Sequence, residues 1–371
     1  MDKRAYLYVI GSAALFGLGA PLSKILLRGV SPVPLAGLLY LGAFLGLSMF
    51  TIVRRIVRPG REAKSAPFRG RDAAWLAGAV LTGGIAGPIC LLAGLSRISG
   101  TAASLLLNLE GVATALVAVL VFGENAARRV WFALALMTGA GVFLSWDPAR
   151  GRFELAGSLL VVLAMACWGL DNNFTRAISD KDPLFIASVK GLTAGAFSIG
   201  LAVALGLRLP LDATALGGLL LGAFSYGLSL VLYIHGLRHL GAFRAGAFFS
   251  LAPFIGAVAS LAILSDPVRW VLLPGAALMA LGAALLAGET HEHPHRHVRL
   301  AHAHAHVHGD GHHDHAHGPG APPEGAAHSH EHVHEAVDHS HGHWPDIHHR
   351  HDHSLPGGRD PATRSAKETD P

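Results

Sequence analysis

Charged residues and cysteines are scarce in this chain. Only 15% of its 371 residues are charged, against roughly 25% in soluble domains, and it contains two cysteines. So low a charge content argues against an ordinary soluble domain. Both cysteines, Cys90 and Cys167, lie inside apolar segments, so we expect free thiols and not a disulfide or a metal-binding pair. The first apolar segment lacks a following Ala-X-Ala site, so we expect no cleaved signal peptide.

The charges that are present form two blocks of opposite sign. Residues 289–371 carry 13 acidic and 6 basic residues, a formal charge of −7, which leaves residues 1–288 at +11. A basic region of this size can indicate nucleic-acid binding. Here the arginines stand in short loops between long apolar stretches, which is the pattern of a membrane protein. We therefore expect a lipid bilayer, and no nucleic acid, as a partner.

Long apolar stretches account for most of residues 1–288. A membrane span needs about 20 mainly apolar residues, and ten stretches qualify, although the fifth is short. They are 5–27, 34–53, 73–95, 101–122, 130–146, 155–177, 184–207, 213–236, 241–264 and 270–288. We predict an all-α, multi-pass protein of the inner (cytoplasmic) membrane with ten transmembrane helices. Loop arginines concentrate on one side, above all in 54–72, so both termini are expected to be cytoplasmic.

The two halves of this region share short motifs. Phe16-Gly17-Leu18 matches Trp168-Gly169-Leu170 at a shift of 152, and Gly94-Leu95 matches Gly236-Leu237 at a shift of 142. Each half then contains five spans, and because five is odd, the second half enters the membrane from the opposite face. Inverted-topology repeats are characteristic of secondary transporters, whose substrate site lies near the membrane midplane.

Several of these motifs resemble those of the EamA-type transporters of the drug/metabolite transporter superfamily. Besides the Phe-Gly-Leu and Trp-Gly-Leu starts, they are Thr101-Ala-Ala-Ser-Leu-Leu-Leu-Asn-Leu-Glu110, Phe122-Gly-Glu124 and Leu251-Ala-Pro253-Phe254. The resemblance implies two inverted five-helix repeats that transport a small solute. We place these EamA-like repeats at 1–146 and 147–288. Gly111, where the family often has proline, departs from the family pattern.

Glu110 is the first candidate for a transport site. It lies near the middle of the fourth predicted span, with Asn108 close by. Charges inside a span are costly and usually face a cavity or a partner. Glu110 is therefore a candidate proton acceptor or cation ligand; the alternative is a structural carboxylate that neighbouring helices satisfy.

A second polar group lies in the sixth and seventh spans. Asp171, Asn172 and Asn173 offer one carboxylate and two amides, which can bind a cation or polar solute or can cap a helix near the interface. Lys190 can neutralise Glu110 or Asp171, or meet an anionic substrate. The interpretation that we favour for Lys190 is extension along its stem to the membrane surface.

Histidine is concentrated after residue 289. This segment holds 23 of the 25 histidines, mostly as alternating His-X-His runs. Imidazole suits Ni, Co and Zn, and alternate residues of an extended chain project the same way. We predict that a divalent transition metal (Ni, Co or Zn) binds the tail, and that no cofactor is otherwise required. The predicted ligands are His302, His304, His306, His308, His312, His313, His315, His317, His328, His330, His332, His334, His339, His341, His343, His348, His349, His351 and His353.

The rest of the tail composition predicts its physical state. Apolar clusters are missing from 289–371, so the segment cannot offset its ordering entropy, and we expect a disordered cytoplasmic tail in the absence of metal. A pH sensor and an inert low-complexity expansion are the alternatives to metal binding.

Two classes of function follow from these features. The first is a secondary transporter, an exporter, whose cargo or regulation is linked to divalent transition metals through the tail. Metal efflux is favoured, and a metabolite or drug exporter whose tail only buffers metal is the alternative. The second class is a non-transporting membrane metal sensor. An enzyme is not expected, because no nucleophile–base pair or phosphate-binding loop stands out. Expected partners are the bilayer, a small solute or metal ion, and a second copy of the chain in a homodimer.

Overall fold

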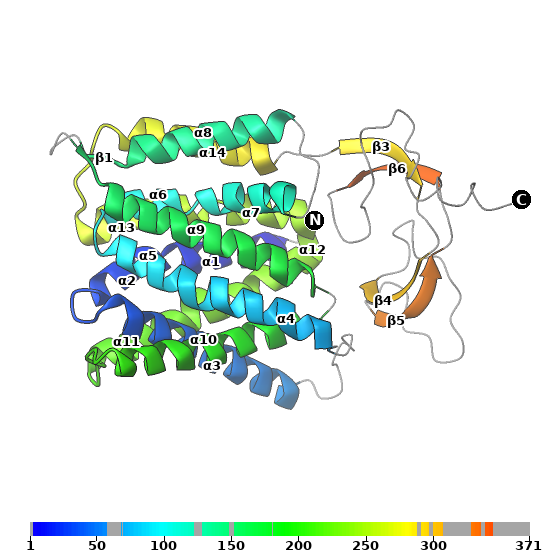
Figure 1. The fold of residues 1–371 in the computed structure, drawn as a ribbon. Coiled ribbons are helices and arrows are strands. Elements are labelled where there is room, and N and C mark those ends of the chain that lie inside the picture. Colours follow the sequence, from blue (N-terminus) through cyan, green and yellow to red (C-terminus); the bar gives the residue numbers. More distant parts are fainter. Residues whose placement is uncertain are drawn as a thin grey trace, which may run out of the picture.

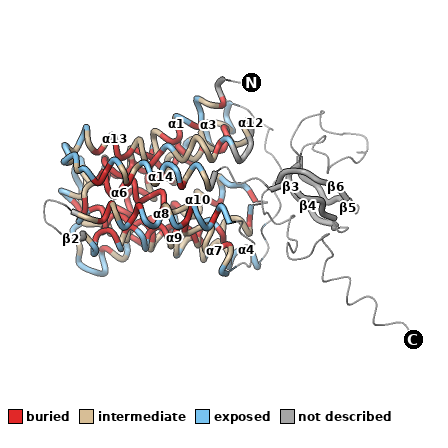
Figure 2. Tube along the Cα trace, turned by 90° about the horizontal axis from the view of Figure 1, so that it is seen from above, coloured by how far each residue is buried: buried red, intermediate tan, exposed pale blue. Residues whose placement is uncertain are grey.

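A computed structural model shows the protein as a bundle of helices that run side by side (Figure 1). The structure describes residues 3–57, 68, 70–121, 128–147, 152–179 and 181–287, together with four strands after residue 290. Buried residues follow the inner faces of the helices and exposed residues the outer faces (Figure 2). Large apolar side chains are exposed on those outer faces, among them Leu45, Met49 and Ile56, as expected where lipid replaces water.

The first half of the bundle ends at a small β-ribbon. Its helices are α1 (Lys3–Gly17), α2 (Gly19–Leu26), α3 (Pro32–Val57), α4 (Gly70–Ala79), the π-helical segment η1 (Val80–Ala86), α5 (Gly87–Leu95), α6 (Gly100–Leu106), α7 (Leu109–Leu120) and α8 (Arg128–Leu144). The ribbon pairs β1 (Trp146–Asp147) with β2 (Arg152–Phe153) in antiparallel fashion. Helix α6 begins where the Ser99 hydroxyl accepts a hydrogen bond from the Ala102 N–H, a standard N-cap.

The second half contains a similar order of elements. They are α9 (Leu155–Arg176), α10 (Pro183–Ala204), α11 (Ala213–Leu221), the π-helical segment η2 (Gly222–Leu228), α12 (Ser229–Phe249), α13 (Ala252–Leu264) and α14 (Leu272–Ala287). Asp182 and Asp212 cap α10 and α11, accepting hydrogen bonds from the N–H groups of Leu184 and Thr214. The hydrogen bond from Thr214 holds the pKa of the exposed Asp212 carboxyl below its ordinary value.

Eight stretches of the described residues are helical, long and apolar enough to cross a membrane. They coincide with eight of the ten predicted spans. The predicted fifth and tenth spans correspond to α8, with 17 residues, and α14, with 16. At 1.5 Å per residue each is about 25 Å long, short of the roughly 30 Å hydrocarbon core. The structure therefore supports a multi-pass membrane protein without confirming ten full-length spans.

Each half packs against the other along several helix pairs. The pairs are α1 with α12, α3 with α10, α5 with α9, α6 with α13, and α8 with α14. Glycine permits the closest approaches, since a Cβ at Gly42 would lie 2.1 Å from the Leu219 carbonyl oxygen, and one at Gly222 would lie 2.0 Å from that of Leu39. Small residues at such contacts are typical of helices that associate within lipid.

The histidine-rich tail contains four described strands. They are β3 (His291–Arg296), β4 (Leu300–His306), β5 (His328–His334) and β6 (Asp338–His343). Strand β3 pairs with β6 and β4 with β5, both antiparallel, and the register sets histidine opposite histidine, as at His304 and His330. Alternation of histidine with a period of two suits a strand, and the disorder that we expected for 289–371 stays a prediction. The remaining predicted ligands, His308, His312, His313, His315, His317, His348, His349, His351 and His353, lie outside the described residues.

Candidate functional site

Helix α9 carries three consecutive polar residues in its last two turns. Successive residues of an α-helix are about 100° apart, so Asp171, Asn172 and Asn173 face different neighbours. Asp171 and Asn173 are buried, whereas Asn172 is exposed. All three precede the end of α9 at Arg176, so they do not cap the helix, which was one of the two interpretations of the sequence.

Asp171 forms a buried ion pair with Lys190 of α10. The Lys190 Nζ lies 2.7 Å from Oδ1 and 2.5 Å from Oδ2 of Asp171, and the two side chains are 16% and 10% exposed, respectively. The Thr175 hydroxyl also donates to Asp171 Oδ1, at 3.0 Å. Extension of Lys190 to the membrane surface, which the sequence favoured, is therefore wrong. A carboxylate one helix away compensates the ammonium group inside the bundle.

Glu110, in the first turn of α7, is held by neutral groups. The Asn172 amide donates to Glu110 Oε1 at 2.9 Å and to the Thr114 hydroxyl at 3.0 Å. The Thr114 hydroxyl in turn donates to the Glu110 backbone carbonyl, at 2.8 Å. Within the described part of the chain, no cation lies within ion-pair distance of Glu110. Glu110 as a whole residue is partly buried.

Asn108 and Asn173 have structural contacts. The Asn108 amide donates to the Leu105 carbonyl at 3.0 Å, in the interruption between α6 and α7. There the backbone N–H groups of Asn108 and Glu110 bond to carbonyls three residues back, a tightening of the helix just before the carboxylate. The Asn173 amide donates to the carbonyls of Thr114 and Gly169 and so ties α9 to α7.

The π-helical segment η1 completes the polar cluster. The Gly83 carbonyl accepts hydrogen bonds from the Tyr40 hydroxyl, at 2.6 Å, and from the Trp168 indole, at 3.0 Å. A Cβ at Gly83 would lie 1.9 Å from Asp171 Oδ2, so only glycine lets the carboxylate approach η1. We refer to Glu110, Thr114, Asp171, Asn172 and Lys190, with Gly83, as the polar cluster.

A row of aromatic rings lies beside this cluster. Tyr40 of α3 is 5.9 Å from Tyr226 of η2 between ring centroids, and Tyr226 is 5.9 Å from Phe16 of α1. Phe249 is 5.4 Å from Phe16 and 4.8 Å from Tyr233. All five rings are partly buried. Tyr40 joins this row to the polar cluster, because its hydroxyl donates a hydrogen bond to the Gly83 carbonyl.

The comparisons with known proteins identify the family. The sequence profile of the EamA-like transporter family matches residues 3–146 and again residues 155–288. The chain belongs to the EamA-like transporter family. It is 29% identical over 274 residues to an uncharacterized transporter of Methanothermobacter thermautotrophicus, covering 71% of this chain and 80% of the relative. A crystal structure described only as that of a protein superposes with a TM-score of 0.54 at 17% identity, covering 77% of this chain and 96% of the other, and shows likeness of fold alone.

This EamA-like transporter has two interfaces between its halves that the shifts of 152 and 142 residues relate to each other. The polar cluster lies at one of them. The 152-residue shift pairs Asp171 with Gly19, and the 142-residue shift pairs Glu110 with Ala252. Pro32 and Pro183 begin the corresponding helices α3 and α10, so Lys190 of α10 corresponds to Leu39 of α3. The second interface is therefore uncharged at these positions. Its counterpart of Gly83 is Ser225, whose hydroxyl donates to the Leu15 carbonyl at 2.7 Å and faces Gly19.

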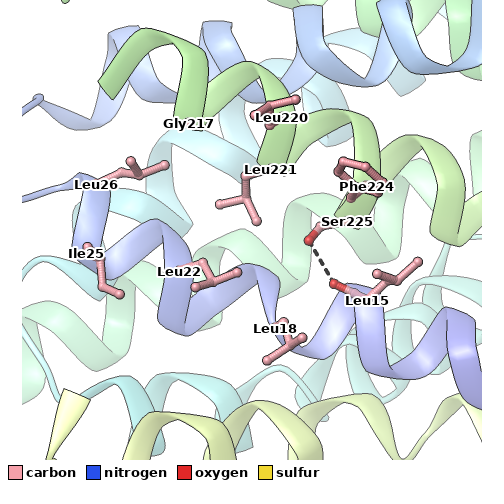
Figure 3. Close-up of a pocket in the computed structure, with 10 residues that line it drawn as sticks. All are labelled: Leu15, Leu18, Leu22, Ile25, Leu26, Gly217, Leu220, Leu221, Phe224 and Ser225. Atoms are coloured by element: carbon pink, nitrogen blue, oxygen red, sulfur yellow. Dashed lines mark hydrogen bonds between the residues drawn. The ribbon is translucent and has the colours of Figure 1, made fainter. Parts of the chain in front are cut away.

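The uncharged interface contains an apolar groove of about 420 Å³ (Figure 3). Its walls come from α1 and α2 on one side and from α11 and η2 on the other: Leu15, Leu18, Leu22, Ile25, Leu26, Gly217, Leu220, Leu221, Phe224 and Ser225. At the polar interface the shifts of 142 and 152 residues place Trp75 and Phe174 at the positions of Gly217 and Leu22, and their ring centroids are 5.7 Å apart. Gly217 and Leu22 replace that aromatic pair here, and their smaller volume leaves the groove.

Tyr40, Gly83, Thr114 and Trp168 are the members of this site that the sequence reasoning missed. Two signals were present: the Gly83-Gly84 pair inside an apolar span, and Trp168 in the duplicated Trp-Gly-Leu motif. Neither identifies a hydrogen bond to a π-helical carbonyl. Among the described residues, the search for three or more clustered His, Cys, Asp or Glu side chains finds no metal site.

Proposed function

We propose that this protein is a secondary transporter that exports a small organic solute, which binds at the polar cluster. The observation that carries the proposal is the carboxylate of Glu110, which has no cation within ion-pair distance in the described chain and is hydrogen-bonded to Asn172, an exposed residue. Polar groups of this kind within membrane helices are expensive, and they usually serve a transport pathway. In this proposal Glu110 and Asn172 contact the solute or the coupling cation, and the Asp171–Lys190 pair fixes α9 against α10.

The proposed mechanism is alternating access between two inverted repeats, 1–146 and 147–288. The direction of the chain supports this, because α1 begins at the end of the bundle opposite the β1–β2 ribbon that joins the halves (Figure 1). The second half then starts from the opposite face. Helix pairs such as α3 with α10 and α6 with α13 form the surface along which one half rocks against the other.

We assign the metal link to regulation and not to cargo. Metal cargo needs several ligands inside the spans, and the polar cluster offers one carboxylate without a cation partner, together with amides and a hydroxyl. The tail instead supplies imidazoles at high density. In the proposal, residues 289–371 lie in the cytoplasm, bind Ni²⁺, Co²⁺ or Zn²⁺, and regulate export or buffer the metal.

Uptake into inverted membrane vesicles tests this assignment. Radiolabelled Ni²⁺, Co²⁺ and Zn²⁺ are given to full-length protein and to a version that ends at Gly288. We expect metal retention by the full-length protein only, and no flux into the vesicle lumen with either version. Metal flux that survives truncation and is lost in Glu110→Gln would show instead that metal is the cargo. Equal retention by both versions would remove the tail from the proposal.

A further inference from the structure

The two corresponding interfaces also differ at the ends of the helices that form them. We call the end of the bundle where α4 begins and α9 ends the α4 end, and the opposite end, with the β1–β2 ribbon, the ribbon end (Figure 1). Helix α4 belongs to the first half and α9 to the second, so a contact between their ends joins the two halves. The proposed orientation places the α4 end in the cytoplasm.

A buried ion pair joins the halves at the α4 end. The Nζ of Lys181, which lies between α9 and α10, is 3.1 Å from Oδ2 of Asp72 in the first turn of α4, and the two side chains are 4% and 17% exposed, respectively. The Lys181 Nζ also lies 5.9 Å from the centre of the Phe68 ring. Phe68 in turn packs against Phe185 of α10, with 5.3 Å between ring centroids. A carboxylate and an aromatic ring of the first half therefore both contact this ammonium group of the second.

The ribbon end has uncharged residues at the corresponding positions. The 152-residue shift pairs Lys181 with Gly29, and the 142-residue shift pairs Asp72 with Thr214. The structure supports this correspondence, because a Cβ at Gly29 would lie 3.5 Å from the Thr214 hydroxyl oxygen. The same two segments thus meet at both ends of the bundle, and the ion pair is present at one of them.

Packing differs between the two interfaces in the same sense. Trp75 and Phe174 stand side by side at the polar interface, whereas the apolar groove lies between α2 and α11 at the other (Figure 3). At the ribbon end the halves are also joined by Thr101, whose backbone N–H and hydroxyl donate to Asp266 at 2.8 and 2.9 Å. Those donors are neutral, where the α4 end has a buried ammonium group. The structure is therefore held more firmly at the α4 end.

The charges make this contact sensitive to separation of the halves. A buried ammonium group or carboxylate that loses its partner is costly, whereas both groups are well solvated once water reaches them. Removal of one partner therefore destabilises the closed arrangement and leaves an open one almost unaffected. An equilibrium between two arrangements shifts by that difference in free energy.

We infer that the Asp72–Lys181 ion pair is a latch that holds the α4 end closed and favours the state that opens toward the ribbon end. This inference rests on the proposed function, because a latch acts only if the two halves move. In the proposed orientation the favoured state faces away from the cytoplasm. The latch must then open before an exporter can take up its solute, and its strength sets the fraction of the protein that is ready to load.

Distances between spin labels at the α4 end test the latch. Full-length protein with Cys90→Ala and Cys167→Ala carries labels at Ala73→Cys and Ser179→Cys, two exposed positions on opposite halves. Double electron–electron resonance in lipid nanodiscs then gives the populations of short and long distances. We expect the short distance to dominate in this labelled parent protein.

Charge variants of the pair should shift these populations. Lys181→Glu sets a like charge against Asp72 and should raise the ratio of long to short distances by about fivefold or more. Adding Asp72→Lys to Lys181→Glu restores opposite charges and should return most of the lost short-distance population. If Lys181→Glu does not fold, Asp72→Asn serves instead, because it keeps the side-chain shape and removes one charge.

Moving the latch to the ribbon end provides a matched control. Gly29→Lys with Thr214→Asp places opposite charges at the corresponding positions, and a Cβ at Gly29 makes only an ordinary van der Waals contact there. An ion pair at the ribbon end favours closure of that end. The ratio of long to short distances at the α4 end should therefore rise, although Asp72 and Lys181 are unchanged.

Two results overturn the inference. One is a ratio that neither Lys181→Glu nor Asp72→Asn changes, and the other is a ratio that the restored opposite charges do not bring back toward the parent value. Failure of the proposed function looks different. In that case the latch variants shift the distances as expected, but liposomes containing the parent protein transport none of a panel of amino acids, amines and nucleosides.

Discussion

Asp171 takes part in two contacts that its α9 neighbours cannot replace. It bonds Lys190 through both oxygens, and it lies so close to Gly83 that any side chain there would collide with it. A buried pair of this kind is worth little relative to two apolar residues, but loss of one partner leaves an uncompensated charge. The coupling free energy between Asp171 and Lys190 should therefore exceed the contribution that either residue makes to stability by itself.

A double-mutant cycle at this pair measures that coupling. We expect Lys190→Met to destabilise the protein by about 3–5 kcal/mol, because the Asp171 carboxylate remains without its cation. The double variant Asp171→Asn with Lys190→Met should recover most of the loss, because it contains no buried charge. Thermal unfolding of the four proteins in one detergent gives the comparison. Additive losses would show that the two residues act independently.

Sequence reasoning located most residues of the site but not their pairing. Glu110, Asp171, Asn172 and Lys190 stand out because polar side chains are rare in apolar spans. Which carboxylate Lys190 reaches depends on the distance and rotation between α9 and α10, and span patterns carry neither. The favoured interpretation of Lys190 was wrong for this reason.

At the scale of elements, the apolar stretches of the sequence predict where the helices lie. They do not predict where the helices are interrupted. The break between α6 and α7, and the π-helical segments η1 and η2, lie inside stretches that read as uninterrupted spans. Each π segment contains a backbone bond to a carbonyl five residues back, from Gly87 to Thr82 and from Ser229 to Phe224. Such bonds depend on the packing of neighbouring helices, so composition alone does not reveal them.

The apolar groove predicts which glycines of the bundle accept a larger side chain. A Cβ at Gly217 meets the flexible end of Leu26 at 3.0 Å and otherwise faces the groove. We expect Gly217→Trp, which restores the aromatic residue of the other interface, to change the unfolding free energy by less than about 1 kcal/mol.

Gly42→Ala provides the contrast, because its Cβ would lie 2.1 Å from a backbone oxygen. Close packing leaves no room for that atom, and we expect a loss of about 1–3 kcal/mol or more. Unfolding temperatures in detergent compare the two variants with the parent protein. A larger loss for Gly217→Trp than for Gly42→Ala would contradict the packing described for the groove.

At the scale of the whole molecule, the basic loops and the odd number of spans predicted for each half predict the orientation. Arginines concentrate in 54–72, on the side that we place in the cytoplasm, and the β1–β2 ribbon lies at the opposite end of the bundle from the start of α1 (Figure 1). The ribbon should then face away from the cytoplasm, and the tail should face into it.

Fusions to topology reporters test this orientation. Alkaline phosphatase is active only outside the cytoplasm, so we expect activity for a fusion after Asp147 and none for a fusion after Gly288. Green fluorescent protein at the same positions should give the reverse pattern. The same reporter active at both positions would mean that the second half crosses the membrane an even number of times, which contradicts the five spans expected for it.

The two π-helical segments change which residues share one face of the helix before and after each segment. Each π turn holds one residue more than an α turn, and one residue corresponds to a rotation of about 100°. The angular phase of α5 relative to α4, and of α12 relative to α11, therefore slips by that amount at Val80–Ala86 and Gly222–Leu228. A helical wheel drawn across either segment assigns bundle-facing residues to the lipid side, so the helix on each side of the segment needs a wheel of its own.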